Sequence, residues 1–120
     1  MAIPSGTGTE VLKSVTDYDR TTGTFTAIDL TATGIWTATV LSIIICNHHG
    51  SQSSTNNIII NNGTNDIFLK HGSAIPLGIK ETFVWNDKFV LMDGWQLKFT
   101  RIDATGSYDT TVSYILQDWT

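Results

Sequence analysis

Charge is scarce in this chain of 120 residues. Only 15% of the residues are charged, against roughly 25% in typical soluble domains. Lys and Arg number 7 and Asp and Glu number 11, so the net charge is -4. Such a balance provides no basic surface for a nucleic-acid backbone or an anionic membrane. We therefore expect no nucleic acid and no membrane among the partners.

Cysteine and long apolar runs are also nearly absent. The one cysteine, Cys46, excludes an internal disulfide framework and a zinc site built on paired cysteines, and we expect it to be buried and inert. The most apolar run, Val40–Cys46, is much shorter than the roughly 18 residues of a membrane-spanning helix. The start of the chain, Met1–Ser5, lacks the basic and apolar regions of a signal peptide. These features predict a soluble protein of a reducing compartment.

Good helix formers are sparse, whereas Thr, Ile, Val and the aromatics, which favour strands, are plentiful. Turn signals recur at the roughly 8–12-residue spacing of an all-β sandwich or barrel. We predict an antiparallel β-sandwich, of jelly-roll type, as a single domain over residues 11–120 after an N-terminal arm of residues 1–10. The expected strands are Glu10–Val15, Thr24–Leu30, Trp36–Cys46, Asn56–Asn61, Asp66–Lys70, Glu81–Trp85 with Phe89–Leu91, Trp95–Ile102 and Ser107–Leu116.

The last two expected strands have the residue pattern of strands that are buried on one face only. Apolar residues alternate with polar ones in Trp95–Ile102 and again in Ser107–Leu116, which predicts one wet face for each strand. We expect these two strands to form a hairpin around residues 103–106. Asn62-Gly63 predicts a second hairpin with a type I′ turn.

The run Val40–Cys46 differs from these two strands, because it has apolar residues at both odd and even positions and therefore on both faces of a strand. Such a strand is either central in the fold or in contact with another chain. Apolar area without obvious cover predicts self-association, with a homotrimer as the expected state. The expected contacts with another copy or a partner protein are Ile3, Pro4, Thr7, Trp36, Leu41, Ile43, Ile45 and Trp119.

Catalytic motifs lack their structural context. Asp17-Tyr18-Asp19-Arg20-Thr21 matches a phosphatase signature, but that chemistry needs a buried parallel strand and crossover helices. We interpret the segment as a polar turn, and its spacing does not fit a calcium loop either. The chain contains no nucleophile elbow and no phosphate loop. We expect no enzymatic activity, no cofactor and no bound metal.

Two further groups of residues leave alternatives open. His48 and His49 are expected to be plain loop histidines, unless each subunit of an oligomer gives one of them to a metal on a symmetry axis. Among the four tryptophans, Trp36 and Trp119 are the freest to stack on a sugar ring. Packing or subunit contact is the stronger interpretation for both.

The C-terminal half contains a recognisable series of motifs. These are Ile75-Pro76-Leu77-Gly78, Glu81-Thr82-Phe83, Phe89–Phe99 and Val112-Ser113-Tyr114-Ile115, and the N-terminal half adds Val40–Asn47. Together they resemble small all-β virion proteins of tailed bacteriophages. Trp95 departs from the pattern, since related chains often have an acidic residue after the glycine.

The resemblance implies a non-enzymatic accessory protein of the virion, assembled in the host cytoplasm and exposed on the particle surface. The first expectation is a capsid decoration, or cement, protein that stabilises the head by binding the major capsid protein. The alternative is a tail, neck or fibre accessory protein, such as a host-receptor or carbohydrate-binding module. The arm of residues 1–9 is expected to lie across a neighbouring subunit.

Overall fold

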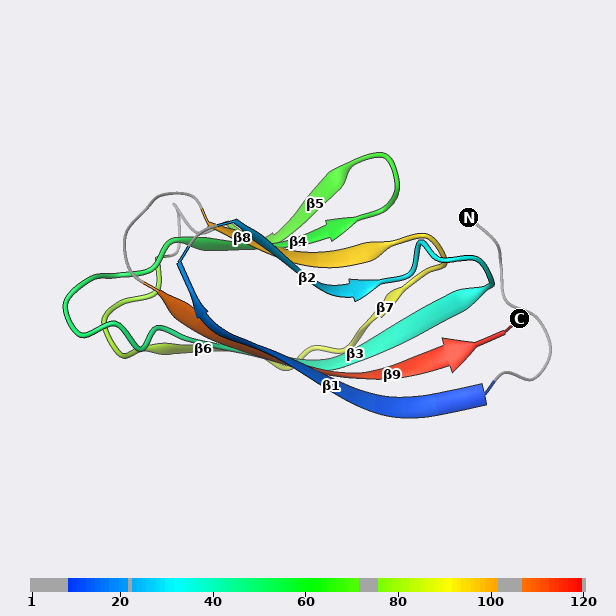
Figure 1. The fold of residues 1–120 in the computed structure, drawn as a ribbon, viewed down its shortest axis with the longest axis horizontal. Coiled ribbons are helices and arrows are strands. Elements are labelled where there is room, and N and C mark those ends of the chain that lie inside the picture. The colour runs from blue at the N-terminus through cyan, green and yellow to red at the C-terminus, as the bar shows by residue number, and fades with distance from the viewer. Residues whose placement is uncertain (1–8, 22, 72–75, 102–106, 120) are drawn as a thin grey trace.

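The computed structural model describes residues 9–21, 23–71, 76–101 and 107–119. These residues form two antiparallel sheets packed face to face (Figure 1). The predicted all-β sandwich is therefore confirmed. The strands are β1 (Thr9–Arg20), β2 (Thr24–Asp29), β3 (Trp36–Cys46), β4 (Asn56–Asn61), β5 (Asp66–Lys70), β6 (Thr82–Trp85), β7 (Phe89–Leu91), β8 (Gln96–Arg101) and β9 (Tyr108–Asp118).

Five strands form what we call the large sheet, in the order β1-β9-β3-β6, with β7 also paired to β3. The small sheet has the order β2-β8-β4-β5. Strand β1 includes Thr9, which pairs with Asp118, so Thr9 and Glu10 of the expected arm lie in the sandwich. The arm residues Ile3, Pro4 and Thr7 lie outside the described residues.

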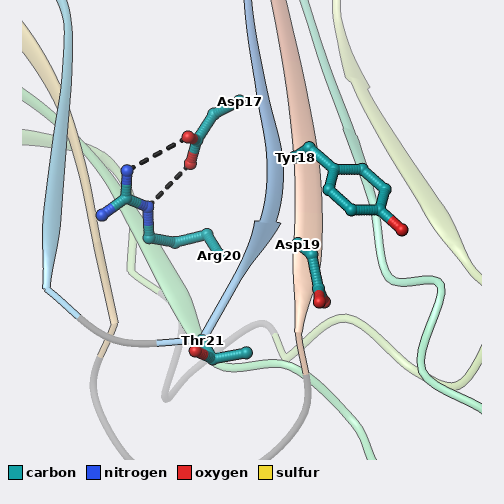
Figure 2. A pocket seen from close by; sticks show the side chains of 5 residues that line it. All are labelled: Asp17, Tyr18, Asp19, Arg20 and Thr21. Carbon is teal, nitrogen blue, oxygen red and sulfur yellow. Dashed lines mark hydrogen bonds and ion pairs between the residues drawn. The ribbon is translucent and has the colours of Figure 1, made fainter.

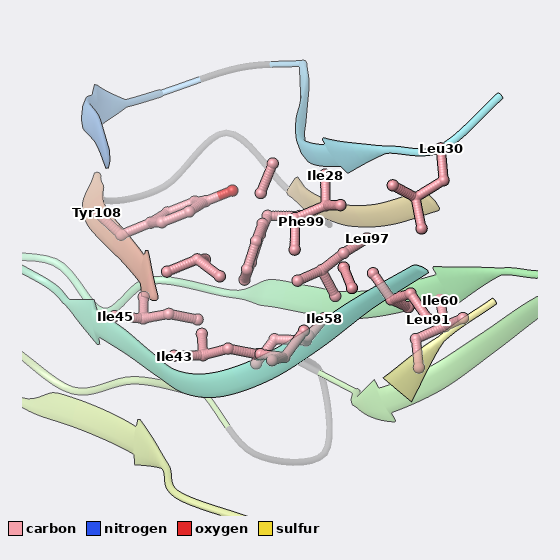
Figure 3. Close-up of a cluster of buried hydrophobic side chains, with 14 of the residues drawn as sticks. Ile28, Leu30, Ile43, Ile45, Ile58, Ile60, Leu91, Leu97, Phe99 and Tyr108 are labelled. Carbon is pink, nitrogen blue, oxygen red and sulfur yellow. The ribbon is translucent and has the colours of Figure 1, made fainter. Parts of the chain in front are cut away.

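The core lies between the two sheets, where side chains of both meet (Figure 3). The large sheet contributes Ile43, Ile45 and Tyr108, and the small sheet contributes Leu97 and Phe99, all with 0% of their surface exposed. Alternation explains why Leu97 and Phe99 both point into the core, because neighbouring positions on a strand point to opposite faces and these two are separated by one residue. The predicted half-buried patterns of β8 and β9 are therefore confirmed.

The predicted hairpin of the last two strands is wrong. Strand β8 belongs to the small sheet and β9 to the large sheet, so the chain crosses from one layer to the other between them. Residues 102–106, which make this connection, lie outside the described part. An alternating pattern identifies a half-buried strand, but it does not say which sheet the strand joins.

The predicted hairpin at Asn62-Gly63 exists, but its turn type differs. Strands β4 and β5 pair up to Asn61 and Asp66, which leaves a loop of four residues instead of two. Gly63 has a positive φ of 90°, whereas Asn62 is not among the residues with positive φ. A type I′ turn needs positive φ at both central positions, so that part of the prediction is wrong.

The strand β3 contains a β-bulge that changes the interpretation of its apolar run. Its pairing with β9 shifts between Val40 and Ser42, and such an extra residue reverses the facing of everything beyond it. Val40, Ile43 and Ile45 consequently all point into the core, each 0% exposed. Two expected contact residues, Ile43 and Ile45, therefore have no accessible side-chain surface for another chain, and that prediction is wrong for them.

Cys46, at the end of β3, is half-buried rather than buried. Within the described ranges, no helix is long and apolar enough to cross a membrane.

Candidate interaction surface and polar clusters

The middle of the outer face of the large sheet, which points away from the core, is neutral and partly apolar, and the charged Glu10 lies in the row at its end, where it is paired with Gln117. Register places Leu12, Ile115, Thr39 and Val90 side by side across four strands. Paired residues share a face, and this row faces outward because the neighbouring residues Ala38 and Val40 point into the core. Leu12 is 72% exposed and Val90 is 48% exposed. The row therefore presents apolar surface to solvent.

Two more rows continue this outer face along the strands. One contains Ser14, Ser113 and Ser42, and the other contains Thr16, Thr111, Ile44 and Val84. None of the side chains in the three rows carries a charge. Ile44 is 40% exposed and Val84 is 49% exposed. We call these three rows the outer neutral face.

Sequence reasoning did not find this surface. It assigned the contact role to Ile43 and Ile45, whereas the bulge directs their neighbour Ile44 outward. The arrangement of these rows depends on cross-strand register, which a single sequence does not specify. The low content of charged residues was the signal that pointed towards it.

The remaining expected contact residues are partly buried. Trp36 packs against the core and its Nε1 donates to the carbonyl oxygen of Thr33 at 3.3 Å. The Nε1 of Trp119 donates to Thr37 Oγ1 at 3.0 Å, and Leu41 is half-buried. Both indoles thus have partners within the chain, as the packing interpretation of Trp36 and Trp119 predicts. Neither ring is a fully exposed platform for a sugar.

The segment Asp17–Thr21 lines a small open hollow at the end of β1. It is not the predicted polar turn, because Asp17–Arg20 belong to the strand, whose pairing with β9 is irregular here. Asp19 has a φ of 53°, so its backbone is left-handed. Figure 2 shows that Asp17 and Arg20 lie on one side of the strand and Tyr18 and Asp19 on the other.

Both carboxylate oxygens of Asp17 are held by Arg20. Nε of Arg20 donates to Oδ2 at 2.7 Å and Nη2 donates to Oδ1 at 3.1 Å (Figure 2). The hydrogen bonding of the guanidinium to Asp17 is the main reason why the pKa of Arg20 is raised. This two-point pairing gives both carboxylate oxygens of Asp17, the first residue of the phosphatase-like motif, a partner within the same strand.

On the other side of the strand, His48 connects three parts of the chain. Its Nδ1 lies 2.8 Å from Asp109 Oδ2, at the start of β9, and its Nε2 lies 3.0 Å from Asp19 Oδ1. The ring of Tyr18 stacks on the imidazole with centroids 5.7 Å apart. The hydrogen bond with Asp109 is the main reason why the pKa of His48 is raised, since a carboxylate favours the charged ring. A sequence reveals no such triad, whose members are distant along the chain.

This arrangement bears on the metal interpretation of the histidines. Both ring nitrogens of His48 are in contact with carboxylates, and Nδ1 of His49 accepts backbone hydrogen bonds from Ser51 and Gln52. Among the residues that the structure describes, no group of three possible ligands could hold a metal ion. A site shared across a symmetry axis would have to displace the Asp partners of His48.

Comparisons with known proteins add one observation on the fold. No protein-family model and no curated protein match the chain. A solved structure described as "Bacillus endospore appendages form a novel family of disulfide-linked pili" matches with a TM-score of 0.53 and 8% identity. The match covers 100% of this chain and 97% of the other. At this identity the likeness supports the β-sandwich and nothing finer.

Proposed function

We propose that the protein is a non-enzymatic structural component of a bacteriophage virion that decorates the capsid. The observation that carries the proposal is the outer neutral face, which offers exposed apolar and hydroxyl side chains with no charge. Specific interfaces have apolar, charge-depleted centres. The phage and capsid context comes from the resemblance of the sequence motifs to those of small virion proteins. The second candidate is a tail, neck or fibre accessory protein, because the same motifs fit it.

Self-association, with a trimer as the proposed state, belongs to the same proposal. The sequence predicts self-association from the apolar run of β3. Ile43 and Ile45 of this run are in the core and leave no surface for a second copy. The outer neutral face now supplies the apolar area that a second copy or a capsid protein would cover. Sedimentation of the purified protein at micromolar concentration tests this part, and a clean monomer in the absence of particles would contradict it.

The solved pilus structure suggests a different assembly, an appendage subunit. In this sequence of 120 residues, however, Cys46 is the one cysteine. One thiol per subunit links subunits in pairs, whereas a disulfide-linked chain requires at least two. The disulfide linkage in that structure's title therefore does not transfer to this sequence, and a virion role remains the proposal.

Electron cryomicroscopy of phage particles with and without the protein tests the location. We expect additional density on the outside of the head. Density at the tail, neck or fibres would support the second candidate, and absence from the particle would overturn both.

A pair of matched variants tests the outer neutral face itself. Thr39 lies in the row with Leu12 and Val90, and we expect Thr39→Lys to weaken rebinding to stripped particles at least about tenfold, or about 1.4 kcal/mol, because it buries an unpaired charge. Thr26→Lys is the control, since Thr26 is an exposed threonine on the small sheet. Equal binding by the two variants would remove this face from the proposal.

A further inference from the structure

A lysine and an asparagine are buried together at one end of the β4–β5 hairpin. Lys70 is the last residue of β5 and is 2% exposed, and Asn56 is the first residue of β4 and is 0% exposed. Lysine is almost never fully buried unless it is paired. Nζ of Lys70 donates to the backbone oxygen of Asn56 at 3.1 Å and to its side-chain Oδ1 at 2.9 Å.

The other sheet closes this site. The ring of Phe83, from β6 of the large sheet, has its centroid 5.6 Å from Nζ of Lys70. The amine thus lies between the layers, away from water. Burial lowers the pKa of Lys70, because the ammonium form loses its hydration there. Burial thus favours the neutral amine over the ammonium, and a neutral lysine amine is a nucleophile.

The carboxamide of Asn56 has a free end. Its Oδ1 accepts from Lys70, while its buried Nδ2 has no hydrogen-bond partner. The hydroxyls of Ser54 and Thr55 are also buried without a partner, so three consecutive residues carry such atoms. Buried polar groups are normally satisfied, and a cluster of unsatisfied ones calls for an explanation.

The geometry brings the two reacting groups together. The carbonyl carbon of Asn56, Cγ, is one bond away from the oxygen that contacts Nζ. Reacting atoms held at roughly 3–3.5 Å in a fixed orientation react far faster than the same groups in solution. For the reaction, Nζ has to leave its hydrogen bond with Oδ1 at 2.9 Å and approach Cγ, the atom bonded to that oxygen.

We propose that Lys70 and Asn56 form an intramolecular isopeptide bond. The Nζ–Cγ bond forms, the Cγ–Nδ2 bond breaks and ammonia leaves, with a proton passing from Nζ to the departing nitrogen. The product is a secondary amide, and neither an oxidant nor a co-reactant is needed. Exclusion of water from the site protects the product from hydrolysis.

Such a bond would fasten an edge of the sandwich. Strand β5 is an edge strand of the small sheet, and its Ile67 and Phe68 are 43% and 47% exposed. The bond closes a covalent ring over residues 56–70 and prevents the edge strand from separating from β4. This inference is independent of which assembly the protein joins.

Intact-mass measurement of the purified full chain tests the bond. We expect a mass lower than the sequence mass by one ammonia. Digestion with trypsin and with a protease that cuts before Asp66 separates Asn56 from Lys70 in an open chain, and we expect these two fragments to remain joined. Lys70→Arg and Asn56→Ala should have the full sequence mass, while Lys98→Arg on the neighbouring strand β8 should keep the loss.

Asn56→Asp provides an independent check, because its bond forms with loss of water and gives the same final mass as the natural chain. A full sequence mass of the natural chain, or separate fragments after digestion, would overturn the proposal. So would a loss of ammonia that persists in Lys70→Arg, since a cyclised Asn62-Gly63 loses ammonia without joining two fragments. The fragment measurement needs no variant, so a Lys70 variant that fails to fold does not affect the result.

Discussion

Strands β3 and β4 look alike in sequence but differ in their surroundings. Each contains consecutive apolar residues, Ile43-Ile44-Ile45 in β3 and Ile58-Ile59-Ile60 in β4. In β3 the middle isoleucine is 40% exposed, whereas in β4 it is 4% exposed. Consecutive apolar residues in a strand therefore do not show whether the face that points away from the core is covered by other side chains.

The cover over β4 comes from its two neighbours. Ile59 is paired with Lys98 of β8 on one side and Phe68 of β5 on the other. The Nζ of Lys98 lies 3.4 Å from Asp66 of β5, so the lysine side chain crosses over β4 to reach its partner. Long aliphatic stems commonly cover apolar surface while the charged end stays near water.

On β3 the corresponding neighbours of Ile44 are Thr111 and Val84. Both side chains are too short to cross a strand, so the outer face remains open. This difference between a long lysine and a threonine or valine leaves Ile44 exposed on the large sheet, whereas Ile59 on the small sheet is covered.

Adjacent alanine substitutions in β3 provide the largest expected contrast. Ile43→Ala should lower the free energy of unfolding by about 2–5 kcal/mol, because Ile43 is fully buried and a cavity remains. Ile44→Ala should lower it by less than about 1 kcal/mol, since Ile44 is 40% exposed and its removal leaves no enclosed cavity. Urea unfolding of both variants checks this, and equal losses would contradict the inward facing that the bulge produces.

The cover over β4 predicts an intermediate effect. Ile59→Ala should cost about 2 kcal/mol, more than Ile44→Ala, because Ile59 is buried beneath its neighbours. Lys98→Ala should cost about 1 kcal/mol and Lys98→Met close to none, as methionine keeps most of the aliphatic stem. If Lys98→Met were as destabilising as Lys98→Ala, the ion pair with Asp66 would be the main contribution instead of the cover.

The sequence predicts local features well and long-range ones poorly. The ranges of β3, β4 and β5 agree with the expected strands residue for residue, because each is bounded by strong turn signals. The facing of Ile43 and the placement of β8 and β9 in different sheets were not predicted. A bulge and a sheet assignment depend on which strands pair, and this is decided by packing across the whole chain.

The polar clusters show the same limit. The sequence motif contains Asp19 but not the residue that Asp19 contacts in the structure. That residue is His48, whose other ring nitrogen contacts Asp109. The proximity of these three residues follows from the pairing of β1 and β3 with β9. Composition and spacing contain no trace of that pairing.

The two strands also differ in the polar group near one end. His48, which follows β3, is about one-third exposed, with 35% of its side-chain surface accessible, whereas Lys70 beside β4 is buried. An exposed group exchanges protons readily with solvent and its interactions are weakened by salt. The smallest expected effect therefore concerns pH, and it should appear at the β3 side of the molecule.

The pKa of His48 is raised in the folded protein, mainly by its hydrogen bond with Asp109. The charged ring therefore binds its proton more tightly in the folded state than in the unfolded one, whose pKa is about 6.5. Its stabilising contribution is fully present below about pH 6.5 and is lost as the pH rises through the folded pKa. The urea midpoint of unfolding should consequently fall across this interval.

Asp109→Asn tests the origin of that fall. Without the carboxylate the pKa of His48 should return towards its ordinary value, and the decrease in the urea midpoint above pH 6.5 should become smaller than in the natural protein. NMR titration of the imidazole measures the pKa directly, and added salt should reduce the difference between the two proteins. An unchanged titration of His48 in Asp109→Asn would show that the carboxylate at 2.8 Å is not what raises the pKa.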